Sequence, residues 1–196
     1  MNATSELLLA STSPRRREIL SALRLEFDVC HVDIDETPLP AESAEAMVLR
    51  LASAKVEAAD RGPATLVLGA DTAVVIGDQI LGKPVDEADC LAMLDMLSGR
   101  PHRVVTGVAL HTPAGTETAV STTDVYFREI GRDEALAYWQ SGEPCDKAGA
   151  YAIQGLGGAF VTRIDGSYSG VVGLPVFETL QLLSAAGLTV LASDKQ

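Results

Sequence analysis

The chain has 196 residues, of which 47% are hydrophobic and 21% are charged. This balance is ordinary for a folded globular protein and excludes a disordered chain. A formal net charge of −12 repels nucleic-acid polymers, so we expect none as a partner, although a local basic pocket still allows a small phosphorylated ligand. No apolar run reaches the ~18 residues of a membrane span, so we expect no membrane partner. The three cysteines form no zinc or disulfide pattern, which fits a reducing cytoplasm. From the length of the chain we expect a single domain over residues 1–196.

Apolar patterning predicts helices and strands that alternate along the chain. The first half contains predicted strands at 6–10, 26–32 and 65–70 and predicted helices at 14–24 and 41–60. The second half contains a turn at 77–79 within a short hairpin, helices at 86–98, 133–141 and 175–186, strands at 103–112, 116–127 and 159–164, and a loop at 165–173. The two longest strands join at Pro113–Gly115, which predicts an antiparallel hairpin. We therefore expect an α/β fold with a mixed sheet, flanking helices and a long central hairpin.

The sequence STSPRRR at 11–17 directly follows the first predicted strand. Ser13 suits a helix N-cap and Pro14 suits the first helical position. Arginines at 15–17 place cations at the positive end of the helix dipole, where a bound anion would reverse the unfavourable sign. Hydroxyls, helix amides and guanidinium groups all suit a phosphate. We therefore expect an anion site here; the alternative is a solvated basic first turn.

Further acids and cations lie near predicted turns and strand ends. Glu36 lies in a loop just past a strand, and Asp71 follows the strand at 65–70, where open α/β sheets bind ligands. Lys55 falls within the apolar stripe of its helix, which fits either a functional cation or a lysine whose stem crosses an apolar surface. Carboxylates and cations together suit Mg²⁺ or Mn²⁺ and phosphoryl transfer. The alternative is an anion-binding α/β domain without catalysis. Two more cations, Lys83 and Lys147, lie in turns.

Other catalytic motifs are missing from the sequence. No phosphate-binding G-x-x-x-x-G-K-[ST] loop is present, and residues 155–158 lack the third glycine of a dinucleotide fingerprint. No G-x-S-x-G elbow is present, which leaves an esterase unsupported. The three histidines are scattered without metal-ligand spacing.

Several sequence blocks together resemble the Maf family of nucleoside triphosphate pyrophosphatases. The resemblance spans residues 6–186 and is carried by LLASTSPRR at 8–16, Glu36, GADT at 69–72, GKP at 82–84, LSGR at 97–100, DKAGAYAIQG at 146–155 and GLP at 173–175. It implies two lobes around a cleft, in a fold of the Maf and inosine triphosphatase type. It also suggests a homodimer.

The resemblance implies hydrolysis of a nucleoside triphosphate to the monophosphate and pyrophosphate with a divalent metal. Asp71 would be the general base, and Glu36 and Asp71 would bind the metal, although the sequence leaves open which carboxylate takes which role. We expect the substrate to be bound by Ser11, Ser13, Arg15, Arg16, Lys55, Thr72, Lys83, Lys147 and Gln154.

The resemblance also points to a substrate. In the family, the residues matching Arg15, Thr72 and Gln154 tune the choice of base, and Thr72 with the YAIQG form resembles the subgroup that acts on dTTP and UTP. A glutamine amide offers one donor and one acceptor, which suits the imide edge of uracil or thymine. We therefore expect a house-cleaning enzyme for dTTP, UTP or modified pyrimidine nucleotides. The alternatives are a 7-methyl-GTP pyrophosphatase and a nucleotide-binding inhibitor of septum formation.

Overall fold

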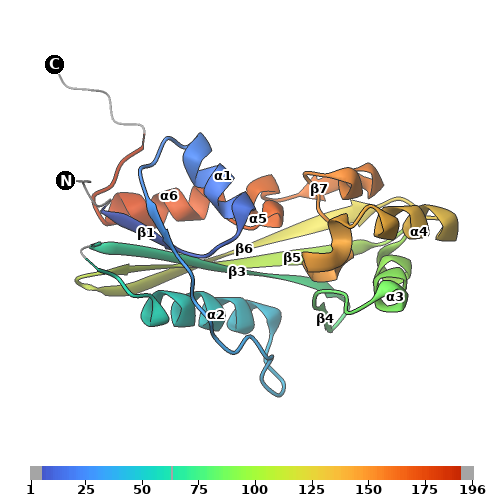
Figure 1. The fold of residues 1–196 in the computed structure, drawn as a ribbon, viewed down its shortest axis with the longest axis horizontal. Coiled ribbons are helices and arrows are strands. Elements are labelled where there is room, and N and C mark those ends of the chain that lie inside the picture. The colour runs from blue at the N-terminus through green and yellow to red at the C-terminus, as the bar shows by residue number, and fades with distance from the viewer. Residues whose placement is uncertain (1–5, 63, 191–196) are drawn as a thin grey trace. The chain divides into compact units, whose positions relative to one another are not determined.

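A computed structural model describes residues 6–62 and 64–190 of the chain. Its described strands form a seven-stranded mixed sheet in which the strand order is β2-β1-β3-β5-β6-β7 and β4 pairs with β3 (Figure 1). Strand β1 (Leu7–Ala10) runs parallel to both β2 (Asp28–Cys30) and β3 (Leu66–Ile76), whereas β4 (Gln79–Leu81) runs antiparallel to β3. The expected mixed α/β fold class is confirmed.

The long hairpin predicted from the alternating pattern is also confirmed. Strands β5 (Pro101–Thr112) and β6 (Gly115–Phe127) are neighbours in the sheet and are joined by a two-residue turn, a connection that only antiparallel strands allow. On its other side β6 pairs antiparallel with β7 (Val161–Asp165).

The chain divides into two compact units, in agreement with the two expected lobes. The first unit holds the described residues up to Asp71, residues 106–120 and the described residues from Gly173 onward. The second unit holds residues 72–105 and 121–172. The expected single domain over residues 1–196 stays a prediction.

The first unit buries both faces of its strands. Leu7 and Leu9 of β1 belong to one apolar cluster, and Leu8 and Ala10 belong to another, because successive strand residues point to opposite faces. The first cluster includes residues of α1 and α6, and the second includes residues of α2, so these helices cover opposite faces of the strands (Figure 1). The helices of this unit are α1 (Pro14–Ala22), α2 (Ala44–Ala58) and α6 (Val176–Ala185).

Two strand glycines let α2 approach the sheet closely. A Cβ atom on Gly69 would lie 2.7 Å from the carbonyl oxygen of Ala52, and one on Gly107 would lie 2.6 Å from the carbonyl oxygen of Val48. Either distance is too short for a real Cβ atom. The two-residue period of a strand places Asp71 on the same face as Gly69. Asp71 therefore faces α2.

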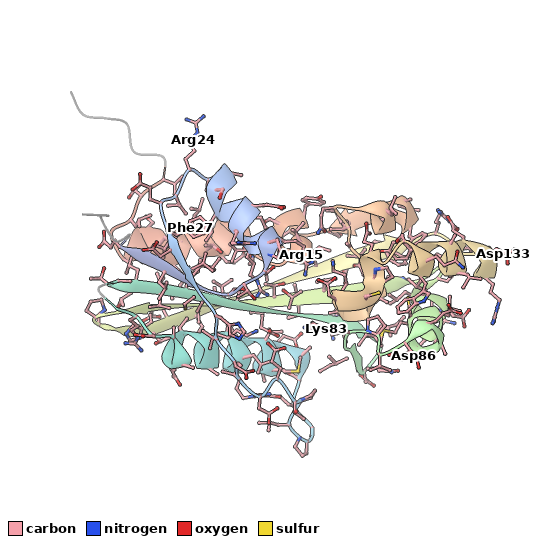
Figure 2. The ribbon with its side chains drawn as sticks, viewed as in Figure 1. Arg15, Arg24, Phe27, Lys83, Asp86 and Asp133 are labelled. Carbon is pink, nitrogen blue, oxygen red and sulfur yellow. The ribbon has the colours of Figure 1, made fainter. Side chains whose placement is uncertain are left out.

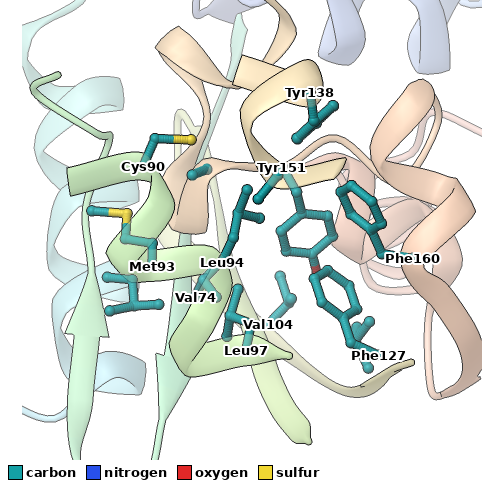
Figure 3. Close-up of a cluster of buried hydrophobic side chains, with 14 residues drawn as sticks. Val74, Cys90, Met93, Leu94, Leu97, Val104, Phe127, Tyr138, Tyr151 and Phe160 are labelled. Carbon is teal, nitrogen blue, oxygen red and sulfur yellow. The ribbon is translucent and has the colours of Figure 1, made fainter. Parts of the chain in front are cut away.

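The second unit is organised around aromatic rings (Figure 3). Tyr138 packs edge-on against Phe160, with ring centroids 5.0 Å apart, and Phe127 packs edge-on against Tyr151 at 4.8 Å. The buried ring of His102 joins them, with Nε2 2.9 Å from the Tyr151 hydroxyl. The helices of this unit are α3 (Glu87–Leu97), α4 (Arg132–Gln140), η1 (Glu143–Asp146), η2 (Ala148–Ala150), η3 (Leu156–Phe160) and α5 (Tyr168–Val172).

The structure corrects one expectation that concerned the site. The strand predicted to end at Asp71 continues without interruption to Ile76. Antiparallel pairing with β4 extends it, and a lysine partner makes a carboxylate tolerable in the middle of a buried strand. Asp71 is therefore a mid-strand residue and does not lie at a strand end.

Two other expectations are corrected at element boundaries. The segment predicted as a loop at 165–173 contains the short helix α5, whose start is held by the Gly170 N–H donating to the Ser167 hydroxyl at 3.0 Å. The helix predicted at 41–60 begins at Ala44, because Ser43 caps it by accepting a hydrogen bond from the N–H of Ala46.

Candidate functional site

The centre of the candidate site is an ammonium group held between two carboxylates. Lys55 Nζ lies 2.7 Å from Asp71 Oδ1 and 2.6 Å from Glu36 Oε1. Lys55 and Asp71 are each only 8% exposed, whereas the Glu36 side chain is 48% exposed. A buried charge is tolerated only when it is paired. We call these three residues the Lys55 cluster.

Local structure explains why this cluster forms. Lys55 lies in the last turn of α2, where the helix dipole favours a cation, and on the helix face that packs on β3. Asp71 faces α2 from β3, so the two side chains meet. The sequence left two interpretations of Lys55 open. Its burial and its two carboxylate partners argue against a lysine stem that carries the ammonium to solvent, and the functional cation stays a prediction.

The loop that carries Glu36 is held by a charged clamp that sequence reasoning missed. Arg50 binds the Glu42 carboxylate with two nitrogens, at 2.6 Å and 2.7 Å, and donates a further hydrogen bond to the Thr37 carbonyl at 3.2 Å. Glu42 also accepts a hydrogen bond from the N–H of Leu39. The bond from Arg50 lowers the pKa of Glu42 to about 2. The clamp therefore keeps its charge at neutral pH and fixes the backbone beside Glu36.

The turn between β1 and α1 brings the predicted hydroxyls and arginines together. Ser13 occupies the expected N-cap position, but its side chain makes no capping hydrogen bond. The Ser11 hydroxyl oxygen accepts hydrogen bonds from the Ser13 N–H at 3.2 Å and from Arg16 Nη1 at 3.1 Å. Arg16 Nε donates to the carbonyl of Gly173 at 2.8 Å. Arg15 lies in the first turn of α1 (Figure 2).

Electrostatics link this turn to the Lys55 cluster. Burial lowers the pKa of the Arg16 guanidinium below its ordinary value, and the positive charge of Arg15 lowers it further, while the nearby carboxylates of Asp71 and Glu36 act in the opposite direction. Arg16 thus lies within electrostatic reach of both acids of the cluster. The first unit therefore gathers hydroxyls, cations and two carboxylates into one charged region.

In the second unit, a backbone hydrogen bond joins the two turns that carry the predicted lysines. Lys83 follows β4 and precedes α3 (Figure 2), and the carbonyl of the preceding Gly82 accepts a hydrogen bond from the N–H of Gly149 at 2.9 Å. Lys147 precedes that glycine by two residues and its Nζ pairs with the carboxylate of Asp146. Gly149 has a φ of 67°, and a Cβ there would lie 2.7 Å from Val74. Only glycine therefore fits this junction.

The two remaining predicted residues also lie in the second unit. Thr72 is half-buried and directly follows Asp71 in β3, so its side chain points to the opposite face of the strand. Gln154 is exposed in the turn before η3.

The donor set fits a metal that is shared with the substrate. No group of three or more His, Cys, Asp or Glu side chains that could hold a metal occurs among residues 6–62 and 64–190. Glu36 and Asp71 nevertheless aim one oxygen each at a single cation, the Lys55 ammonium. Mg²⁺ is typically held by one or two carboxylates together with substrate phosphates. A metal on Glu36 and Asp71 stays a prediction that this geometry fits.

Sequence comparisons place the chain among known proteins. The family model described as Maf-like protein matches residues 6–186. A dTTP/UTP pyrophosphatase of Vibrio parahaemolyticus is 50% identical over 185 residues, which cover 93% of this chain and 98% of the relative. A dTTP/UTP pyrophosphatase of Vibrio vulnificus is 51% identical over 180 residues, which cover 91% and 97%.

Among solved structures, the Ham1 protein of Staphylococcus aureus is similar with a TM-score of 0.45 and 17% identity, over 62% of this chain and 71% of that one.

Within the part of the chain that the structure describes, none of the helices has the length and apolar character needed to cross a membrane.

Proposed function

This chain belongs to the Maf-like protein family, and we propose that it hydrolyses dTTP and UTP to the monophosphates and pyrophosphate. The observation that carries the proposal is the Lys55 cluster, in which a buried carboxylate is kept beside a fixed cation. The choice of substrate is supported by relatives that are named dTTP/UTP pyrophosphatases. Their sequences are about 50% identical to this chain over nearly their whole length.

In the proposed reaction a water oxygen attacks the α-phosphorus of the nucleotide. The bond from that phosphorus to the bridging oxygen of the β-phosphate breaks, and pyrophosphate leaves with the bonding electrons. Asp71 accepts the proton that the water loses. Lys55 holds Oδ1 of Asp71, so we assign the proton to Oδ2. The ammonium also orients the carboxylate, which fixes the base before substrate arrives.

Cationic side chains would bind the triphosphate. In the first unit, the oxygen of Ser11 already accepts two hydrogen bonds, so we assign its own proton to a phosphate oxygen. Positive charge near the departing pyrophosphate stabilises the negative charge that develops there. We assign this role to Arg15, Arg16, Lys55, Lys83 and Lys147, with Ser13 contributing at the start of α1.

A divalent metal completes the proposal. Glu36 and Asp71 would hold it, and Mg²⁺ or Mn²⁺ would neutralise phosphate charge and activate the attacking water. The Arg50–Glu42 clamp would keep Glu36 in place for this role.

Base choice is assigned to the amide of Gln154, with Arg15 and Thr72. One donor and one acceptor on one side chain suit the imide edge shared by uracil and thymine. We propose that the enzyme acts in the cytoplasm, which fits its free cysteines, and that it forms a homodimer.

The test is pyrophosphate release from dTTP, UTP, CTP, GTP and 7-methyl-GTP with Mg²⁺ or Mn²⁺. We expect dTTP and UTP to be the best substrates and metal chelation to abolish release. A preference for 7-methyl-GTP would overturn the proposed substrate. Release from none of the five would overturn the proposed activity.

A further inference from the structure

The carboxylate of Glu143 is hydrogen-bonded to two backbone N–H groups and a tyrosine hydroxyl. Its Oε1 accepts hydrogen bonds from the Tyr138 hydroxyl at 2.7 Å and the Gly157 N–H at 3.0 Å, and its Oε2 accepts one from the Leu156 N–H at 2.9 Å. Burial acts to raise the pKa of Glu143, but the hydrogen bonds from these groups, together with the positive charge of Lys147, outweigh it and hold the pKa below its ordinary value. Glu143 is therefore a charged anchor for this backbone segment.

The hydroxyl of Tyr138 extends this anchor by one more residue. It donates to Glu143 and accepts a hydrogen bond from the N–H of Ala152 at 3.1 Å. The ring is buried and packs edge-on against Phe160 within the aromatic cluster (Figure 3). Because Tyr138 lies on α4 and its ring is packed, its hydroxyl has little conformational freedom. The hydrogen bond from Ala152 therefore fixes the backbone of Ala152 to a packed part of the second unit.

Glycines allow the chain to wrap around this pair. A Cβ on Gly155 would lie 2.2 Å from Glu143 Oε2, and one on Gly157 would lie 2.7 Å from the Tyr138 hydroxyl oxygen. The φ of Gly155 is −116°, a value that other residues adopt. A side chain at position 155 would therefore displace the Glu143 carboxylate from its place against the backbone.

The turn held in this way carries Gln154. The N–H of Gly155 donates to the carbonyl of Ala152 at 3.2 Å, so Ile153 and Gln154 are its two central residues. Ile153 is half-buried and Gln154 is exposed. Tyr138 fixes the chain two residues before Gln154, and Glu143 fixes it two and three residues after. Gln154 is thus presented outward from a turn fixed at both ends.

We propose that Glu143 and Tyr138 are positioning residues that set the base preference of the enzyme through Gln154. This inference rests on the proposed function, in which the Gln154 amide reads the base. An amide discriminates between bases only when its donor and acceptor are held in register with the base edge, and site geometry must be fixed to about 0.5 Å. The carboxylate and the phenol provide that register.

The test begins with Glu143→Gln. The amide nitrogen of glutamine is a donor and faces N–H groups that are also donors, so at least one of the three hydrogen bonds is lost. We expect the preference for dTTP over CTP, as a ratio of kcat/KM, to fall about tenfold. The loss should appear in the KM for dTTP, with kcat changed by less than about threefold. Glu87→Gln removes an exposed carboxylate at the start of α3 and should leave the ratio unchanged.

A double-mutant cycle separates positioning from general support of the fold. If Glu143 acts through Gln154, then Gln154→Ala lowers the dTTP preference and adding Glu143→Gln lowers it no further. Tyr138→Phe should behave like Glu143→Gln with a smaller effect, because it removes the hydroxyl and keeps the ring. Additive losses in the cycle would overturn the inference.

Amide hydrogen exchange gives a readout that needs no nucleotide. In Glu143→Gln the N–H groups of Leu156 and Gly157 should exchange faster, while α3 and α4 keep their protection. Unchanged exchange at both positions, or an unchanged dTTP-to-CTP ratio in a variant that still hydrolyses dTTP, would overturn the inference alone. Failure of the wild-type enzyme to hydrolyse dTTP or UTP would instead overturn the proposed function.

Discussion

The Lys55 cluster and the turn at 152–155 with its anchor Glu143, which we call the Glu143 turn, each depend on a carboxylate, but the partners of the two carboxylates differ in kind. In the cluster, Asp71 is paired with a lysine side chain. In the turn, Glu143 is bound by two backbone N–H groups and a phenol. Backbone partners cannot leave without unfolding the turn, whereas an ammonium group can share its carboxylates with a metal or a substrate. The arrangement around Asp71 suits a carboxylate that takes part in the reaction, and the arrangement around Glu143 suits a carboxylate that positions a loop.

The largest effect on stability is expected from removing the cation of the cluster. Lys55→Met keeps the length of the side chain but leaves Asp71 buried without its partner. We expect the free energy of unfolding to fall by about 3 kcal/mol, the cost typical of breaking a buried ion pair from one side. Urea denaturation measures this change.

A double variant is the control for that prediction. Lys55→Met combined with Asp71→Asn removes both charges, and it should recover most of the lost stability while remaining inactive. If the double variant is less stable than Lys55→Met alone, the pair does not carry the energy that we assign to it.

A second prediction concerns the free energy of unfolding at acid pH, which depends on the buried, uncharged ring of His102 in the second unit. Burial lowers the pKa of His102 to about 4, from an ordinary value near 6.5. Between those values the unfolded chain binds a proton that the folded chain does not, so the free energy of unfolding falls as the pH drops from about 6.5 to about 4. The total loss from this group is about 3 kcal/mol, and it levels off below pH 4.

His102→Gln tests that assignment, because glutamine retains a hydrogen-bonding group for Tyr151 but does not titrate. Its free energy of unfolding, measured by denaturant titration at a series of pH values, should depend less steeply on pH over this range. Identical pH slopes for the two proteins would show that another group is responsible.

A third prediction addresses the close approach of α2 to β3, which brings Lys55 to Asp71. Gly69→Ala forces a methyl group against the backbone of α2 and should lower the free energy of unfolding by about 2 kcal/mol, as overpacking does. Gly82→Ala introduces a methyl group where no atom beyond the neighbouring residues lies within 4 Å, and it should change the free energy of unfolding little. Equal effects of the two substitutions would contradict the close packing.

The smallest effect is expected from the clamp beside the cluster. Arg50→Lys removes the two-nitrogen grip on Glu42, and the loss of such a supporting contact should lower kcat/KM for dTTP about tenfold. The matched control is Arg163→Lys, which alters an exposed pair with Asp165 in the second unit. A clamp variant with wild-type kinetics at limiting Mg²⁺ would remove Arg50 from the account.

Much of the fold was predictable because its signals are local. The long hairpin follows from two alternating runs around Pro113–Gly115, and the start of α1 follows from Ser13 and Pro14. The end of β3 was predicted wrongly because a polar residue inside an apolar run looks like a strand end. Only the distant partner, Lys55, explains why Asp71 is tolerated within the strand.

The sequence singled out the three residues of the Lys55 cluster, but it did not show the contacts that support them. Glu42 and Arg50 are eight residues apart across a loop and a helix start, a spacing that carries no periodic signal. Glu143 had an indirect signal in the glycines at 155, 157 and 158, since such a cluster marks close approach to the backbone. The sequence could not show what approaches them.

The most direct test of the account is pyrophosphate release by Asp71→Asn. The substitution keeps the size of the side chain and removes the base, so the rate with dTTP and Mg²⁺ should fall by about 10²–10⁴-fold. Asp78→Asn, in the exposed turn before β4, should retain the wild-type rate, and circular dichroism should show that both variants are folded. A folded Asp71→Asn enzyme with a near-wild-type rate would contradict the assignment of Asp71 as the general base.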